Sequence, residues 1–103
     1  EDYMSEIEKK KIGTNELIVK PIGRIDITST SKLEEEVNSE LEDITYLTID
    51  MSDVDYISSI GLRALLSFQK ELASRGEMKI VNVKPAVYEI FKMVGFHKIL
   101  NIV

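Results

Sequence analysis

Apolar and polar residues alternate along this chain with the period of strands in some segments and of helices in others. The first two strand-like segments follow each other closely in the sequence. Residues 4–12 form a charged, weakly apolar segment, and residues 17–22 form a more apolar one. The turn-forming residues 13–15 separate them, so a hairpin is predicted over residues 4–24. Pro21 indicates that the second strand has an exposed side or ends nearby.

A first helix is predicted after this hairpin, beyond a loop formed by Gly23-Arg24-Ile25-Asp26. Ser31 and Glu34 have the spacing of a capping box. The apolar positions that follow repeat every four residues and share one helix face: Leu33, Val37 and Leu41. Asp26 has the alternative role of opening this helix. A short apolar strand over residues 46–51 comes next and fits a central position in a sheet.

The second half of the chain repeats this alternation of strand and helix. A strand-like stretch at residues 54–57 leads into a helix, which Arg75-Gly76 closes. The apolar stripe of this helix comprises Leu62, Leu65, Leu66, Leu72 and Ala73. A strand over residues 78–83 precedes a third helix over residues 85–95, which opens with proline. The apolar face of that helix comprises Val87, Ile90, Phe91 and Val94. Residues 99–103 are predicted to form a last short strand.

The predicted order is therefore strand, strand, helix, strand, helix, strand, helix, strand. Strands that alternate with helices form a largely parallel sheet with right-handed crossovers. The predicted fold class is α/β, with a mixed, mostly parallel sheet of about five strands, an N-terminal hairpin and three or more helices.

Length and composition narrow the classes of function. The 103 residues suffice for one domain, predicted over residues 4–103, and Glu1-Asp2-Tyr3 ahead of Met4 are interpreted as a cloning remnant. The net charge of −5 argues against nucleic acid as a partner and favours a basic surface. No apolar run reaches the roughly 20 residues that cross a bilayer. The first ten residues are too charged for a signal peptide, and cysteine is absent. We therefore expect a cytoplasmic protein without membrane contact.

Residues 54–66 carry the most informative pattern, because a strand-like stretch meets two serines, Ser58 and Ser59, then a glycine and then a helix. The two hydroxyl groups are thereby placed at a helix N-terminus, where unpaired N–H groups and the helix dipole favour an anion. A phosphate added there would change the surface charge sharply. The alternative is that the serines only cap the helix, since serine is a preferred N-cap residue.

Other candidate sites lack the groups that their chemistry requires. The aspartates within residues 50–55 have neither the glycine nor the distal glutamate of a calcium loop, so they are expected to be turn residues. Ser67 and Lys70 have a nucleophile spacing found in penicillin-recognising enzymes, but they lie mid-helix without the companion motifs. His97 is the only histidine, which argues against a zinc site or a catalytic triad. Met93 is expected to fill the core. No cofactor and no metal are predicted.

Three motifs occur in the order in which a known family has them. They are the Gly23-Arg24-Ile25-Asp26 loop, the Ser58-Ser59-Ile60-Gly61-Leu62 turn, and the late segment Lys84-Pro85-Ala86-Val87-Tyr88-Glu89-Ile90-Phe91. Together they resemble the STAS domain of bacterial anti-sigma factor antagonists. The resemblance extends from Glu6 to Val103 and implies the STAS fold.

The resemblance implies a regulatory binding protein. In this family the unphosphorylated domain binds a serine kinase that is also an anti-sigma factor. Phosphorylation of one serine releases the kinase, and a serine phosphatase restores binding. The target stands two positions before the glycine of Gly-Leu, which is Ser59 here, with Ser58 as the alternative acceptor in a position where the family often has aspartate. The implied partner surface comprises Asp26, Ile27, Thr28, Ser58, Ser59, Ile60, Gly61 and Arg63.

Two other functions within this family remain open alternatives. The chain could be a scaffold subunit of a stressosome-type signalling complex, or a module that senses a nucleotide or a lipid. The sequence favours neither, since it contains no recognisable basic pocket or aromatic cage. An enzyme is not expected, because no base, metal cluster or activated nucleophile accompanies the serines.

Overall fold

The described part of the chain forms a five-stranded sheet, covered on one face by two helices. The computed structural model describes residues 6–103. Its elements in chain order are β1 (Ile7–Ile12), β2 (Glu16–Ile25), α1 (Ile27–Leu41), β3 (Tyr46–Asp50), β4 (Asp53–Ile57), α2 (Ser59–Leu72), β5 (Glu77–Val81), α3 (Pro85–Met93) and the 3₁₀ turn η1 (Phe96–Lys98). The predictions for residues 1–5, including the interpretation of 1–3 as a remnant, lie outside the described residues. Within the described residues, no helix is both long and apolar enough to span a bilayer.

The predicted N-terminal hairpin is confirmed. β1 pairs antiparallel with β2 along its whole length, and Gly13 in the turn has a φ of 62°, which glycine adopts without a steric penalty. β1 is an edge strand, and two of its lysines reach α1. Lys9 Nζ lies 2.9 Å from Glu36 Oε1, and Lys11 Nζ lies 3.4 Å from Glu40 Oε1. These ion pairs tie the exposed strand to the helix layer.

The sheet is mixed and mostly parallel, as predicted, with the strand order β1-β2-β3-β5. β2 pairs with two strands in succession: residues 16–19 are parallel to β3, and residues 22–25 are parallel to β4. A bulge interrupts the second pairing, because Gly23 faces Val54 whereas Arg24 faces Tyr56. Asp55 therefore has no partner on β2. β4 is a strand of its own, which the predicted order of elements did not include.

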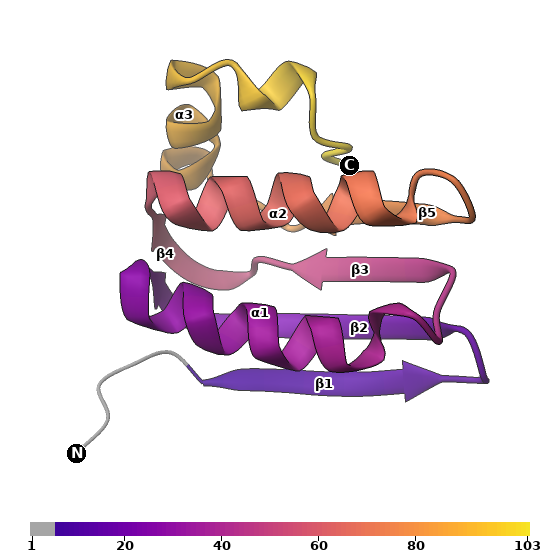
Figure 1. The fold of residues 1–103 in the computed structure, drawn as a ribbon. Helices are drawn as coiled ribbons and strands as arrows, with labels where there is room; N and C mark the ends of the chain where they lie inside the picture. The colour runs from indigo at the N-terminus through magenta and orange to yellow at the C-terminus, as the bar shows by residue number, and fades with distance from the viewer. Residues whose placement is uncertain (1–5) are drawn as a thin grey trace.

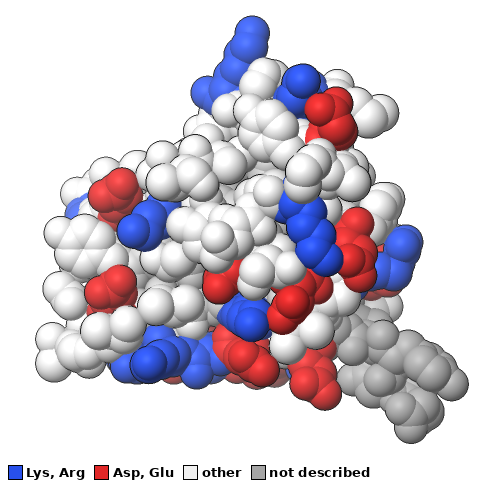
Figure 2. Space-filling model, turned by 180° about the vertical axis from the view of Figure 1, so that it is seen from behind, with Lys and Arg blue, Asp and Glu red and all other residues white. Residues whose placement is uncertain are grey.

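α1 and α2 lie side by side on one face of the sheet (Figure 1). Apolar residues of these helices and of strands β2, β3 and β5 form the core, and they include Val19, Leu33, Val37, Leu47, Ile49, Leu65, Phe68 and Ile80. The opposite face of the sheet carries neither α1 nor α2, and charged side chains of both signs are scattered over it (Figure 2). α3 packs against β4, and η1 follows it. The carboxyl ends of β2 and β4 thus meet close to the starts of α1 and α2.

The start of the first helix differs from the prediction. Residues 23–25 belong to β2 and do not form a loop, and the N-cap of α1 is Asp26, not Ser31. The reason is a complete capping box: the N–H of Ser29 donates to Asp26 Oδ1 at 3.2 Å, and the N–H of Asp26 donates to Ser29 Oγ at 2.8 Å. The alternative reading, in which Asp26 opens the helix, is therefore confirmed.

The C-terminal segment also differs from the prediction. Residues 99–103 form no strand beyond a single parallel bridge between Ile102 and Ile80. The N–H groups of Ile99 and Leu100 still donate to the carbonyl of Phe96 in the turn of η1, so only residues 101–103 can pair with β5. β5 itself ends at Val81, because Asn82 adopts a φ of 60°. Met93 is not in the core, since it is 82% exposed at the end of α3.

Candidate functional site

The two predicted site segments lie together because they follow neighbouring parallel strands. Ile25 at the end of β2 pairs with Ile57 at the end of β4, and the N–H of Ser58 donates to the carbonyl of Ile25 at 2.8 Å. Asp26 and Ser58 are therefore the first residues beyond the same edge of the sheet. The carboxyl edge of a parallel sheet is where α/β folds commonly place their functional groups.

The two serines have different structural roles. Ser58 is the N-cap of α2, and its Oγ accepts a hydrogen bond from the N–H of Gly61 at 3.3 Å. Ser59 is the first residue of the helix, and its side chain is exposed. Among the described residues, nothing forms a hydrogen bond with the Ser59 hydroxyl. Capping therefore explains Ser58 and leaves Ser59 available to another molecule.

Gly61 lets the start of α2 pack closely against the ends of both strands. A Cβ atom at this position would lie 2.8 Å from Ile25 Cγ2 and 2.8 Å from Ile57 Cγ1. Carbon atoms in contact normally lie about 3.5–4.0 Å apart, so any side chain would push the helix away from the sheet. Gly61 is buried, and it sets the position of Ser59 relative to Asp26 without itself presenting a surface.

Asp26 is held as a charged capping group. Its pKa is lowered, chiefly because its carboxylate accepts a hydrogen bond from the backbone N–H of Ser29. The Ser29 hydroxyl in turn donates to the carbonyl of Arg24 at 2.6 Å. Asp26 therefore contributes a fixed negative charge beside the serine pair at neutral pH.

Exposed apolar residues surround these polar groups. Ile27, directly after Asp26, is 70% exposed, and Ile60, directly after Ser59, is 42% exposed. Thr28 and Arg63 are exposed as well. The predicted partner-surface residues thus lie at the starts of α1 and α2, beyond the paired ends of β2 and β4. Gly61 differs from the other predicted residues because it is buried. Apolar side chains exposed around polar groups are typical of surfaces that bind other proteins.

A small hollow adjoins Ser59 and includes residues that the sequence did not indicate. Ser59, Leu62 and Arg63 line it from α2, and Val94 and Phe96 line it from the segment after α3. Val94 was predicted on the apolar face of the third helix. It is instead the residue at which the helix ends, and it is 52% exposed. Val94 follows Phe91 at helical spacing, so the apolar pattern did not indicate that the helix would end at Met93, with Val94 as its C-cap.

The aspartates of residues 50–55 are only partly the predicted turn residues. Asp50 Oδ1 accepts a hydrogen bond from the N–H of Ser52 at 3.0 Å, as in a turn. Asp53 and Asp55 lie in β4 instead. Within residues 6–103, no group of His, Cys, Asp and Glu side chains has an arrangement suited to a metal ion.

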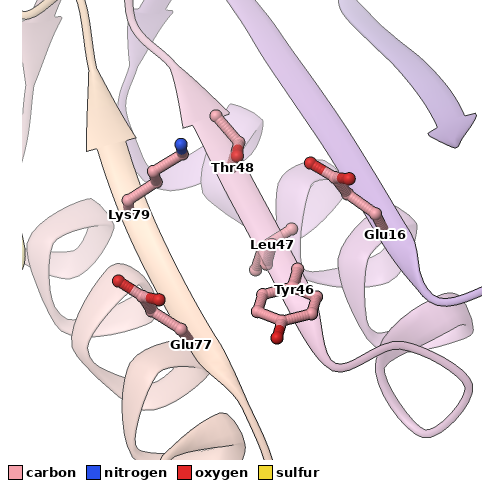
Figure 3. A pocket seen from close by; sticks show the side chains of 6 residues that line it. All are labelled: Glu16, Tyr46, Leu47, Thr48, Glu77 and Lys79. Atoms are coloured by element: carbon pink, nitrogen blue, oxygen red, sulfur yellow. The ribbon is translucent and has the colours of Figure 1, made fainter.

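Another hollow lies at the other end of the strands. It is lined by Glu16, Tyr46, Leu47, Thr48, Glu77 and Lys79 (Figure 3). These residues stand at or near the starts of β2, β3 and β5, whereas Ser59 follows the end of β4. This hollow is therefore separate from the serine site.

Comparison with known proteins identifies the family. A family model of the STAS domain matches residues 6–103. BtrV of Bordetella bronchiseptica, named provisionally as an anti-sigma factor antagonist, is 32% identical over 82 residues, which are 78% of this chain and 71% of BtrV. The solved structure of the anti-sigma factor antagonist SpoIIAA in its unphosphorylated form has a TM-score of 0.82 at 15% identity and covers 95% of this chain and 88% of its own. The Bacillus cell fate determinant SpoIIAA in its phosphorylated form has a TM-score of 0.74 at 14% identity, covering 95% and 91%. The chain belongs to the STAS domain family.

Proposed function

We propose that this chain is an anti-sigma factor antagonist whose unphosphorylated form binds an anti-sigma factor kinase and whose phosphorylation on Ser59 releases that kinase. The name of BtrV supports the role of anti-sigma factor antagonist, and the existence of a phosphorylated SpoIIAA structure supports regulation by phosphorylation. A serine phosphatase would then restore binding.

The observation that carries the proposal is the difference between the two serines. Ser58 is occupied as the helix cap, whereas Ser59 presents an exposed hydroxyl one residue later. A kinase can reach the second group without disturbing the cap. Ser59 is therefore the proposed acceptor.

The fold can accept a phosphate at this position without rearrangement. Phosphorylation adds about −1.5 to −2 charges at pH 7, and a helix N-terminus favours negative charge. Because Ser59 Oγ is exposed, the new group would extend into solvent and displace nothing in the core. The effect of phosphorylation is thus expected to be confined to the surface.

A partner that covers Ser59 would be affected much more strongly. The exposed Ile27 and Ile60 indicate an interface that excludes water around the hydroxyl. A dianion would have to lose its hydration there, next to the negative charge of Asp26. A loss of about 3 kcal/mol of binding free energy would weaken the complex roughly 150-fold.

The direct test is phosphosite mapping after incubation with ATP and the kinase captured from the native cell extract. We expect phosphate on Ser59 and none on Ser58. The Ser59→Ala variant should bind the kinase and resist phosphorylation, and Ser59→Asp should bind weakly. Ser58→Ala is the matched control, because it removes a neighbouring hydroxyl and leaves the acceptor. A protein that carries phosphate on neither serine, although the kinase binds it, would refute the mechanism.

A further inference from the structure

Ser59 and Arg63 are neighbours on the exposed side of α2. They stand four residues apart, a spacing that places two side chains on the same helix face with Cβ atoms about 5–6 Å apart. Both side chains are exposed, and both line the hollow that Val94 and Phe96 close from the other side. A group attached to the Ser59 oxygen would therefore begin within reach of the Arg63 guanidinium.

Arg63 has no partner of its own within the described residues. The other arginines are engaged: Arg24 stacks over the ring of Tyr56 at 4.3 Å, and Arg75 donates to the carbonyl of Leu41 at 2.7 Å. No ion pair or hydrogen bond of comparable kind holds the Arg63 side chain among residues 6–103.

The residues one turn away from Arg63 contain no carboxylate. They are Ser59 and Ile60 on the N-terminal side and Leu66 and Ser67 on the C-terminal side. No carboxylate one turn away therefore competes for the five N–H donors of the Arg63 guanidinium.

We propose that Arg63 binds the phosphate on Ser59, so that phosphorylation adds an anion to the partner surface and at the same time occupies a cation of that surface. This inference rests on the proposed function, since it concerns the same serine. A guanidinium can donate two parallel hydrogen bonds to a phosphate, and such pairs are among the stronger polar contacts in proteins. The carboxylate of Asp26, at the end of the neighbouring strand β2, would repel a phosphate that turned toward it and away from Arg63.

The consequence for the partner is twofold. Before phosphorylation, Arg63 is free to pair with an acidic group of the partner. Afterwards it is held by the phosphate of its own chain. The complex thus loses an attraction as well as gaining an unfavourable charge, and one modification has two effects on binding.

The test uses protein with phosphoserine incorporated during translation at position 59, so that no kinase is needed. The phosphorus NMR signal is followed as a function of pH in three proteins: the phosphorylated wild type, Arg63→Gln and Lys70→Gln. Lys70 is the matched control because it is an exposed cation of the same helix, eleven residues beyond Ser59 and about 16 Å further along the axis. Both substitutions remove one positive charge.

We expect Arg63→Gln to raise the second pKa of the phosphate by about 0.3 units or more, because a neighbouring cation favours the dianion. Lys70→Gln should leave it within about 0.1 units, since a charge that far away is screened. Arg63→Lys should give an intermediate value. Equal titration curves for the wild type and Arg63→Gln would overturn the inference, as would an equal shift in Lys70→Gln.

Failure of the titration test and failure of the proposed function can be told apart. If a kinase never modifies Ser59, the proposed function fails, although the titration shift could still be observed in the translated phosphoprotein. If the kinase acts but the titration curves coincide, only the role of Arg63 fails. Because Arg63 is exposed and contributes nothing to the core, the variants are expected to fold, and far-ultraviolet circular dichroism checks this.

Discussion

Replacing Gly61 by alanine tests whether close packing of α2 on the strand ends holds the site together. The added Cβ would lie 2.8 Å from Ile25 Cγ2 and from Ile57 Cγ1. Both isoleucines are buried to 1% exposure, and the contacted atoms lie close to their backbones, so neither side chain can easily swing away. The helix start must therefore shift outwards, and the serine pair must move with it.

Two opposing terms set the size of the effect. Overpacking a well-filled core costs about 1–3 kcal/mol. Alanine is a better helix former than glycine by up to about 1 kcal/mol in a helix interior, and by less in the first turn, where Gly61 lies. We therefore expect Gly61→Ala to lower the free energy of unfolding by about 1–2 kcal/mol. The sign is opposite to the one that helix propensity alone predicts.

Urea denaturation followed by circular dichroism measures this change. The midpoint should fall by about 0.5–1 M with an unchanged slope. Ser67→Ala is the matched control, because it adds no atoms at an exposed position of the same helix and should change the free energy by less than about 0.5 kcal/mol. In an Ile57→Ala background, the additional cost of Gly61→Ala should be smaller, since Ile57 Cγ1 and also Ile57 Cδ1, which would lie 3.3 Å from the added Cβ, are absent. A Gly61→Ala protein with the wild-type midpoint would refute the packing argument.

Three further predictions concern the same edge of the sheet and one turn. Ser58→Ala removes the cap of α2 and should cost about 1 kcal/mol, seen as a melting temperature lower by roughly 4–8 °C. Asp26 has a lowered pKa in the folded state, so it stabilises the fold above about pH 4. This contribution is lost as the pH falls through the lowered pKa. The difference in urea midpoint between the wild type and Asp26→Asn should therefore become smaller over the same pH range. Gly76→Ala places a Cβ against the backbone carbonyl of Thr45, far inside van der Waals contact, and should destabilise the protein by about 3 kcal/mol or more in the same urea assay.

The sequence predicted the hairpin and the mixed sheet, because each depends on local signals. Turn residues mark the hairpin, and strand-like segments alternate with helical apolar stripes after it. That Asp26 lies near Ser58 was implied only by the family resemblance, because the predicted order of elements lacked β4, the strand that leads to Ser58. The role of Gly61 could not be seen in this way, because it depends on the contacts with Ile25 and Ile57 in three dimensions.

Residues 54–57 were recognised as strand-like, but β4 was not counted as a separate strand in the predicted order, and its buried residues do not have the period of a regular strand. Val54 and Ile57 are both buried although they stand three residues apart. A regular strand would direct them to opposite faces. Only the bulge in the pairing with β2 allows both to face the core, and a bulge has no clear signature in a single sequence.

The first capping box was misplaced because two overlapping signals compete within a few residues. Ser31 and Glu34 have the typical pattern, whereas the pair that actually forms is Asp26 with Ser29. The tertiary structure decides between them, since β2 delivers the chain to the helix at Asp26. The exposure of Met93 could not be predicted either, because it follows from where α3 ends.

The bulge in β4 also determines where the chain can change its length. Because Asp55 has no partner on β2, a deletion of this residue would leave Val54 and Ile57 on the core face and Ser58 beside Ile25, at the cost of a surface ion pair with Lys84. A deletion of Arg24 in β2 would instead turn Ile25 and Asp26 to the wrong faces. Length variation in this part of the molecule is therefore expected to be tolerated on the strand that leads to the serines and not on the strand that leads to Asp26.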